Sequence, residues 1–251
     1  MSTNERYTYS NPTIQEAALE INFRADEGSW TPLSFGKFFE KVMLDFPTIE
    51  NVPAPMFTIE RGSPVTVQLV TSPTQILRYK HRTRPLLLQL TENKISVFEV
   101  GSYTGWEQFK ADIKYAWQNV MEVVQPVSVL QIGLRYINRI ERSNPGESVG
   151  EWLQAIPNIP EAILGSHQGF LSQVVTAPLE NIRISVVVTE FDATDPMGPF
   201  IFDIDIATRK ETSTDTISLL GEIDHLHDTI WDIFSSAKTE KLERLLKGEL
   251  S

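Results

Sequence analysis

One stretch of the chain decides which kind of sheet to expect: Leu130-Gln-Ile-Gly-Leu-Arg-Tyr-Ile-Asn-Arg-Ile140. Its apolar residues recur at every second position, and one face is formed by Leu130, Ile132, Leu134 and Tyr136. Such a period of two is typical of a strand that is buried on one side. We therefore expect a long strand over about residues 127–141, with Gly133 as a place to bend or bulge.

Other segments show the same alternation or a short strand-like run. Near the start, one face is formed by Gln15, Ala17, Leu19, Ile21 and Phe23, and the other by Glu16, Glu20 and Asn22. Leu86–Leu90 and Ile95–Val100 flank a turn over 92–94, which predicts a hairpin. Further strands are expected near residues 65–70, 75–80, 169–177, 182–190 and 199–208.

Helices are predicted where apolar residues recur at spacings of three and four. The first should begin with Thr31 as N-cap and Pro32 at the first helical position, and should end at Pro47. The second should follow Thr104, because Glu107 comes three residues later and completes a capping box. The remaining predicted helices are a short one over 149–156 and a final one that starts near 213–215 and continues as a polar extension over 238–247.

The predicted elements repeat as β-α-β-β-β-α in each half of the chain. The opening strands begin near residues 14 and 127 and the long helices near 104 and 215, offsets of about 113 and 111 residues. We therefore predict an α+β fold of two similar halves, residues 1–125 and 126–251, fused through antiparallel sheet with helices packed on one face. Internal duplication explains the repeat, and chance similarity of two coarse element orders is the alternative.

The composition narrows the class of protein. The 251 residues include 33 acidic and 22 basic side chains, for a formal charge of -11, and no cysteine. Without cysteine the chain has no disulfide, thiolate nucleophile or zinc–thiolate site. The acidic balance argues against nucleic acid as a partner. The sequence has no 18-residue apolar run and starts with a polar segment, so we expect a cytoplasmic protein with no membrane partner and no cofactor.

Five segments, in order along the chain, resemble the motifs of a known family: Asn11-Pro-Thr-Ile-Gln-Glu-Ala17, Ser102-Tyr-Thr-Gly-Trp-Glu107, Gly133-Leu-Arg-Tyr-Ile-Asn-Arg139, Phe202-Asp-Ile-Asp205, and Leu226-His-Asp228 with Phe234. The family is a sporadically distributed set of bacterial and archaeal proteins of about 250 residues and unknown function. The third segment is the most specific. The resemblance covers nearly the whole chain but implies no activity and no catalytic residue. By analogy, a patchy distribution is typical of accessory systems such as defence loci.

The candidate site is a polar cluster in the predicted sheet, consisting of Arg135, Asn138, Arg139, Asp203, Asp205, Glu16 and Glu20. Asp203 and Asp205 point to one face of their strand, where they could bind a divalent cation or perform acid–base chemistry. Alternatively, they pair with arginines on neighbouring strands, and we favour this interpretation. Arg135 and Arg139 share one face and are the natural partners, although two free guanidinium groups could grip a carboxylate or phosphate. Asn138 falls on the other face.

Two further groups invite a functional interpretation. Arg78, Lys80, Arg82 and Arg84, together with His81, form the one basic cluster and a candidate anion patch. The structural interpretation is a positively charged strand edge that protects against aggregation.

Asp224-His-Leu-His-Asp228 looks like a metal motif. In a helix, however, His225 and His227 point about 200° apart and cannot bind one ion together. Asp224, His227 and Asp228 could share one side as a weak metal site, but we favour His227 as a histidine at the edge of the core.

The chain contains no P-loop, dinucleotide-binding glycine motif, zinc-protease motif or nucleophile elbow. We therefore predict a non-enzymatic protein-interaction or regulatory module without catalytic residues. Its expected partner is another protein, or a second copy that pairs through an exposed sheet edge. The alternatives are a metal-dependent hydrolase or nuclease-like enzyme that uses Asp203 and Asp205, and a small-anion sensor built on Arg135 and Arg139.

Overall fold

The computed structural model describes residues 9–60, 66–154, 169–179, 181–190 and 195–250, with backbone alone for 52–60, 66–75 and 179. Nine strands form one antiparallel sheet in the order β2-β3-β4-β5-β1-β6-β9-β8-β7. The strands are β1 (Ile14–Arg24), β2 (Thr48–Glu60), β3 (Thr66–Lys80), β4 (Leu86–Leu90), β5 (Lys94–Val100), β6 (Ser128–Ile140), β7 (Phe170–Leu179), β8 (Ile182–Glu190) and β9 (Phe200–Thr208). The helices are α1 (Leu33–Val42), α2 (Trp106–Val123), α3 (Val149–Trp152), α5 (Thr216–Ala237) and α6 (Glu240–Leu246).

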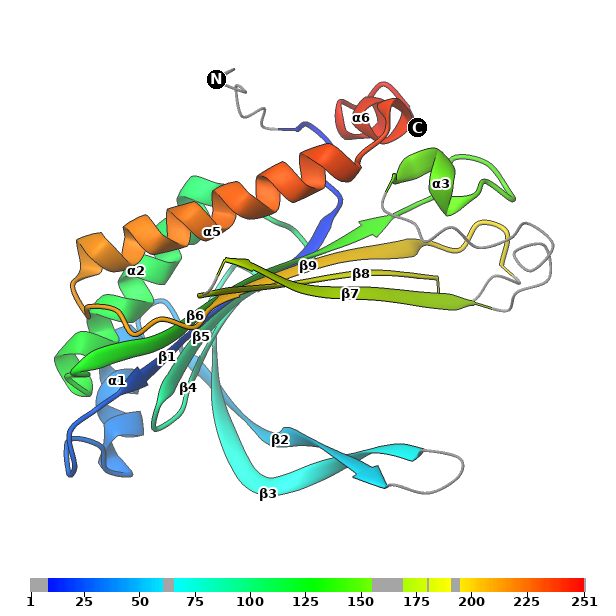
Figure 1. Ribbon diagram of the computed structural model, residues 1–251. Helices are drawn as coiled ribbons and strands as arrows, with labels where there is room; N and C mark the ends of the chain where they lie inside the picture. The colour runs from blue at the N-terminus through cyan, green and yellow to red at the C-terminus, as the bar shows by residue number, and fades with distance from the viewer. Residues whose placement is uncertain (1–8, 61–65, 155–168, 180, 191–194, 251) are drawn as a thin grey trace.

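The sheet is strongly curved, and α1, α2 and α5 cover its convex face (Figure 1). β2 and β3 extend beyond these helices and bend around the concave side. The predicted α+β class and antiparallel sheet are therefore confirmed. Among the described residues, no helix combines the length and the apolar composition needed to cross a membrane.

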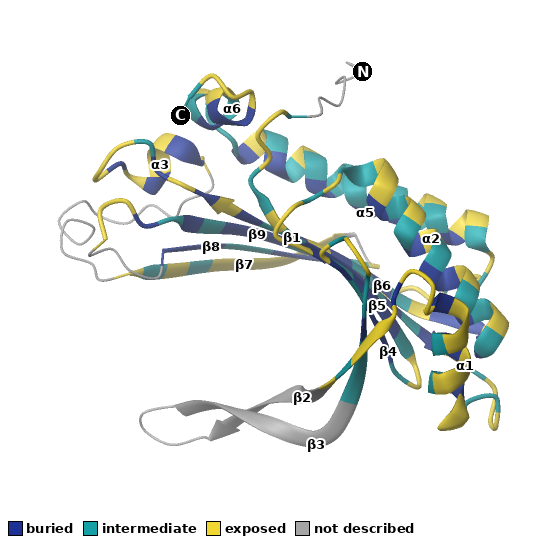
Figure 2. Ribbon diagram, turned by 180° about the vertical axis from the view of Figure 1, so that it is seen from behind, coloured by how far each residue is buried: buried dark blue, intermediate teal, exposed yellow. Residues whose placement is uncertain are grey.

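The main hydrophobic core lies between the convex face and the helices (Figure 2). Its largest fully buried side chains include Trp117 and Phe109 of α2, Phe38 of α1 and Phe23 of β1. The apolar stripes predicted for α2 and α5 face this core. The buried residues of α5 are Leu219, Ile223, Leu226, Ile230, Phe234 and Ala237.

The central strand β6 alternates as its sequence predicts. Ile132, Leu134 and Tyr136 are buried, whereas Arg135 and Arg139 are exposed. Leu130 departs from the prediction, because it is 40% exposed. In the ladder with β1, Asn22 pairs with Gln131 and Phe23 with Val129, so Leu130 is the extra residue of a bulge. The irregularity falls there and not at the predicted Gly133.

β1 lies in the middle of the sheet, between β5 and β6. Ala17, Leu19, Ile21 and Phe23 are buried as expected. Gln15 is exposed, since a second register shift between Ile14 and Glu16 removes it from the alternation. From β1 outward the order is β5, β4, β3, and from β6 outward it is β9, β8, β7. The sheet therefore has corresponding strands on either side of β1 and β6, while the duplication and the boundary at 125 and 126 stay predictions.

The first half contains one strand more than the predicted pattern. β2 was not predicted, because Pro53 and Pro55 interrupt its sequence. Proline is tolerated at a sheet edge or bulge, and β2 is an edge strand with its register shift at these two residues. The strands predicted over 65–70 and 75–80 are parts of β3, apart from Val65, which lies outside the described residues.

Several helix ends differ from the predictions. α1 begins at Leu33, one residue later than expected, and ends at Val42, well before Pro47. α3 ends at Trp152, and residues 155 and 156 of its predicted span lie outside the described part of the chain. The polar extension is a separate helix: Lys238 is extended and bridges to Leu153, and the Thr239 side chain then caps α6.

Candidate functional site

The structure brings part of the predicted polar cluster together on the concave face. Arg135 donates to both carboxylate oxygens of Asp203, with Nε–Oδ1 and Nη2–Oδ2 distances of 2.9 and 2.7 Å. This hydrogen-bonded pairing raises the pKa of Arg135. The Asp203 side chain is only 12% exposed. The bidentate geometry is that of a structural cross-strand pair.

Three other charged members of the cluster, Asp205, Glu20 and Arg139, bond to residues other than Arg135 and Asp203. Arg183 donates to Asp205 Oδ2 at 3.2 Å, and burial nevertheless raises the pKa of Asp205 above its usual value. Lys94 donates to Glu20 at 2.7 Å. Arg139 donates to Glu141 at 2.6 Å, so it does not join Arg135 at the two aspartates. Arg135 and Arg139, the natural partners predicted for the two aspartates, therefore bond to different residues.

Glu16 and Asn138 complete the predicted cluster, but they lie on opposite sides of the sheet. The negative charge of Glu16 acts on Arg135 and contributes to its raised pKa. Asn138 is buried against the helices: it accepts from the Thr13 hydroxyl at 3.0 Å and donates to the Phe202 carbonyl at 3.2 Å. Asn138 therefore belongs to a different environment from the charged residues.

The predicted anion patch is divided between several partners. Lys80 pairs with Glu50 at 2.7 Å, and Arg82 donates to the Leu44 carbonyl at 2.8 Å. Arg78 is half-buried and lies on the same face of β3 as Lys80. Arg84 turns to the helix side and bonds Asp112 at 2.5 and 3.0 Å. These four side chains do not converge on one anion site.

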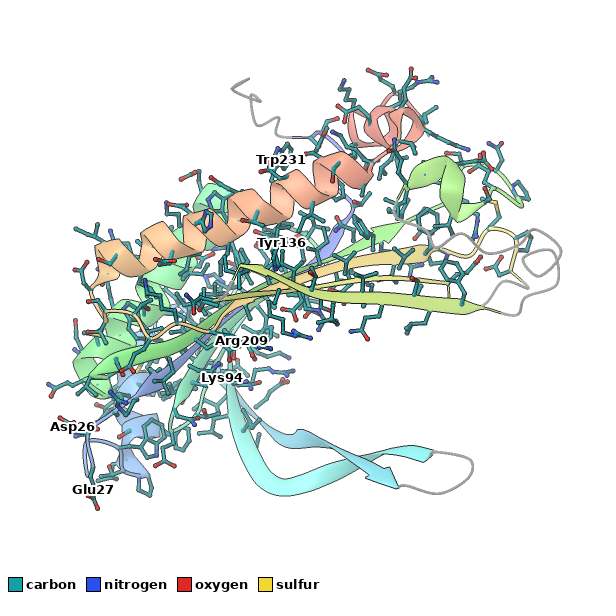
Figure 3. All side chains as sticks on the ribbon, in the orientation of Figure 1. Asp26, Glu27, Lys94, Tyr136, Arg209 and Trp231 are labelled. Carbon is teal, nitrogen blue, oxygen red and sulfur yellow. The ribbon has the colours of Figure 1, made fainter. Side chains whose placement is uncertain are left out.

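A cavity of about 370 Å³ lies on the helix side of the sheet, and we call it the aromatic pocket. It is lined by residues from 9–14, by 103–107 at the start of α2, by Tyr136 and Asn138 of β6, by residues from 227–234 of α5, and by Leu246. Figure 3 shows Tyr136 beneath α5 and Trp231 on that helix. Four of the five segments that the sequence analysis singled out therefore meet at one place.

Aromatic rings form much of the pocket wall. Trp106 stacks on His227 with ring centroids 3.9 Å apart and an interplanar angle of 8°. The Trp106 indole donates to Asp224 at 3.1 Å, and Lys110 donates to the other oxygen of Asp224 at 2.5 Å. His225, in contrast, is exposed. The predicted divergence of the two histidines thus holds, and the described residues contain no group of three or more metal-ligating side chains that could hold an ion.

Two tyrosines meet at the sheet side of the pocket. The Tyr103 and Tyr136 hydroxyl oxygens are 3.0 Å apart, and their rings cross at 89°. Burial raises the pKa of both phenols, so both stay protonated at neutral pH. Only one of their two hydrogens can lie between the oxygens. The other remains available for a hydrogen-bond acceptor.

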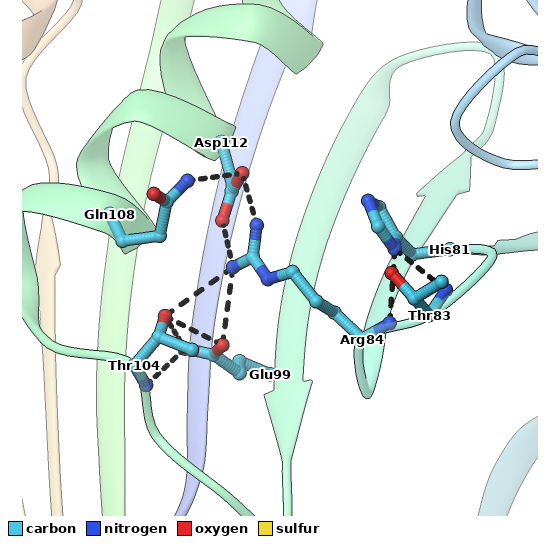
Figure 4. Close-up of polar contacts among 7 residues, drawn as sticks. All are labelled: His81, Thr83, Arg84, Glu99, Thr104, Gln108 and Asp112. Atoms are coloured by element: carbon cyan, nitrogen blue, oxygen red, sulfur yellow. Dashed lines mark hydrogen bonds and ion pairs between the residues drawn. The ribbon is translucent and has the colours of Figure 1, made fainter.

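A buried carboxylate holds the turn that leads into the pocket. Glu99, whose side chain is 0% exposed, accepts from the Thr104 hydroxyl at 2.8 Å and from the Thr104 backbone N–H at 3.2 Å. Arg84 bridges Glu99 and Asp112 (Figure 4). The predicted capping box is therefore wrong: Thr104 bonds Glu99, and α2 begins after Gly105, whose φ of 101° suits glycine.

Sequence reasoning did not assign Tyr9, Tyr103, Trp106, Tyr136 and Trp231 to a site. Their rings are the usual content of a core, and no local pattern distinguishes a ring beside a cavity from one inside the core. The only available signal was the resemblance, which marked the segments of most of them. No protein-family model and no curated protein matches the chain, so the resemblance stays a prediction and the geometry carries the functional argument.

Proposed function

We propose that this protein is a non-enzymatic regulatory module that binds a small organic molecule in the aromatic pocket. The observation that carries the proposal is the cavity of about 370 Å³, whose wall combines aromatic rings with a few polar groups from distant parts of the chain. Small-molecule pockets in proteins are concave, mostly apolar and about 300–1,000 Å³ in volume, with a few convergent polar groups. The aromatic pocket falls at the lower end of that range.

The state of the polar groups supports binding over catalysis. The Tyr103 and Tyr136 phenols are neutral and bonded to each other, and Asp224 is occupied by Trp106 and Lys110. These groups are held in fixed pairs, which suits recognition. The hydrolase and anion-sensor alternatives have less support, because the aspartates and arginines they require are bonded to neighbouring residues.

Toluene tests the proposal as a minimal apolar probe. Of the five tryptophans in the chain, Trp106 and Trp231 line the aromatic pocket. We expect toluene to shift the indole N–H resonances of these two saturably in ¹⁵N-correlated NMR spectra and to raise the Tm. The resonances of Trp30, Trp117 and Trp152 should stay in place, and they serve as internal controls. Equal movement of all five, or no saturable movement, would contradict the proposal.

A second proposal concerns a partner protein: two copies pair through β7. This strand is one edge of the sheet and exposes Leu171, Val174 and Val175 by 67, 60 and 54%. Residues 170–179 contain no charged side chain in a chain of charge -11, so two such edges can approach without local repulsion. Natural edge strands are usually protected by charge, proline or bulges. In β7 the register shift and Pro178 come after Thr176, so the apolar edge before them is open to strand addition.

We expect the wild-type protein to sediment as a dimer and Val174→Lys to sediment as a monomer at the same concentration. A lysine on an edge strand must lose hydration when the edges pair. Ile217→Lys is the matched control, because Ile217 is 83% exposed on α5, far along the chain from β7. It should leave the dimer intact. A monomeric wild type would refute this second proposal.

We also propose that the fold arose by internal duplication. The support is the corresponding order of β1, β5, β4, β3 and β6, β9, β8, β7 on either side of the sheet centre. Superposition of β1 and α2 on β6 and α5 tests it: the flanking strands should coincide under the same rotation.

A further inference from the structure

The wall of the aromatic pocket contains two pairs of stacked rings. Tyr9 stacks on Trp231 with centroids 5.9 Å apart and an angle of 27°. Trp106 and His227 form the other pair. Aromatic rings interact best with other planar rings, in stacked or edge-to-face geometry. The composition of the wall therefore favours a planar aromatic molecule over a branched aliphatic one.

The pocket also has a hydrogen-bond donor that lacks an acceptor. The Tyr103 and Tyr136 side chains both line the pocket, and their pair retains one hydroxyl hydrogen beyond the one that joins the two oxygens. A buried donor without a partner is unfavourable. An occupant that carries an oxygen acceptor satisfies such a donor.

The charge of the wall argues against an anionic occupant. The described residues that line the pocket include no lysine or arginine, and Glu107 is their only carboxylate. A carboxylate ligand would therefore lie near a like charge. An ammonium ligand could meet Glu107 and the ring faces, which attract cations, but it offers no acceptor to the tyrosine hydroxyl hydrogen; it is the strongest competitor.

From these three observations we infer that the aromatic pocket selects a small, uncharged, planar aromatic molecule with a hydrogen-bond acceptor, such as an amide or ketone oxygen. The inference rests on the proposed function, since it requires that the pocket binds a small molecule. It deepens that function by naming the ligand class.

Four probes with the same ring separate the alternatives: benzamide, benzoate, benzylamine and toluene. Each is titrated into the wild-type protein at pH 7, with the Trp106 indole resonance as readout. We expect benzamide to bind roughly tenfold more tightly than each of the others, the effect of one or two additional hydrogen bonds.

A double variant tests whether the tyrosine hydroxyl groups cause this preference. Tyr103→Phe/Tyr136→Phe should lower the benzamide-to-toluene preference at least threefold while toluene still binds. Tyr79→Phe is the control, because the Tyr79 hydroxyl is buried elsewhere and donates to the Phe35 carbonyl at 3.3 Å. It should leave the preference unchanged, and the Tm of each variant shows that it is folded.

The outcomes distinguish this inference from the proposed function. If none of the probes binds, the proposed function fails and the inference falls with it. If toluene binds as tightly as benzamide, the pocket binds small molecules but its donors do not select the ligand. If benzylamine binds most tightly, the aromatic pocket is a cation site. Either of the last two results overturns the inference alone.

Discussion

Replacing Arg142 with methionine should destabilise the protein by about 3–5 kcal/mol, because it leaves a buried carboxylate without its guanidinium partner. Arg142 and Glu190 have side chains that are each 5% exposed, and Arg142 Nη2 donates to the Glu190 carboxylate. The same guanidinium donates to the carbonyls of Glu147 and Gly198. Urea denaturation measures the loss as a lower midpoint at an unchanged slope.

The control for this prediction is Arg139→Met, three residues earlier. Arg139 and its partner Glu141 are 44 and 57% exposed, so their separation should cost less than about 1 kcal/mol. In the double variant Arg142→Met/Glu190→Gln the buried charge is also removed, and part of the lost stability should return. Equal losses for Arg142→Met and Arg139→Met would show that burial does not govern the strength of these pairs.

Glu99→Leu is the second change with a large expected effect, about 3 kcal/mol, since the fully buried carboxylate binds both polar groups of Thr104 and also Arg84. The loss should extend to the aromatic pocket, because the turn that Glu99 holds carries Tyr103 and Trp106. We expect the toluene Kd, measured on the Trp106 resonance, to rise at least about fivefold.

Glu122→Leu provides a matched control on α2. Glu122 pairs with Lys41 on the surface and is 60% exposed, so the substitution should change stability by less than about 0.5 kcal/mol and leave toluene binding unchanged. If Glu99→Leu lowers stability without weakening toluene binding, Glu99 supports the fold but does not position the pocket.

The alternation of apolar and polar residues predicted strands correctly where one face of the strand is buried. β6 shows this: Ile132, Leu134 and Tyr136 alternate with polar residues because the helices cover only one side. The same logic failed at Leu130, where a bulge shifts the register. A bulge depends on how two strands align, and a single strand does not contain that information.

The failed capping box illustrates the limit of local reasoning. Thr104…Glu107 and Ser148…Glu151 have the same spacing. At Ser148 the Glu151 side chain accepts from the capping residue's N–H at 2.9 Å, as the motif requires. At Thr104 a carboxylate from β5 takes the place of Glu107. The fold places Glu99 beside Thr104, and this tertiary contact overrides the preference of the local sequence for a capping box.

The candidate site was predictable only in part for the same reason. The Arg135–Asp203 pair follows from two adjacent strands, but Arg139 found a closer partner in Glu141 along its own chain. The aromatic pocket depends on the packing of α5 over β6 and on the turn before α2. Those placements join residues more than 90 positions apart, such as Tyr136 and Trp231, and no periodicity predicts them.

The position of the aromatic pocket has a consequence for cohesion of the chain. Tyr103 and Trp106 come from the first half and Tyr136, His227 and Trp231 from the second, and the pairing of β1 with β6 joins the halves beneath them. A bound molecule therefore acts as a noncovalent cross-link between the halves. By thermodynamic linkage, occupancy should strengthen reassembly of two separately expressed halves to the same extent that reassembly strengthens binding.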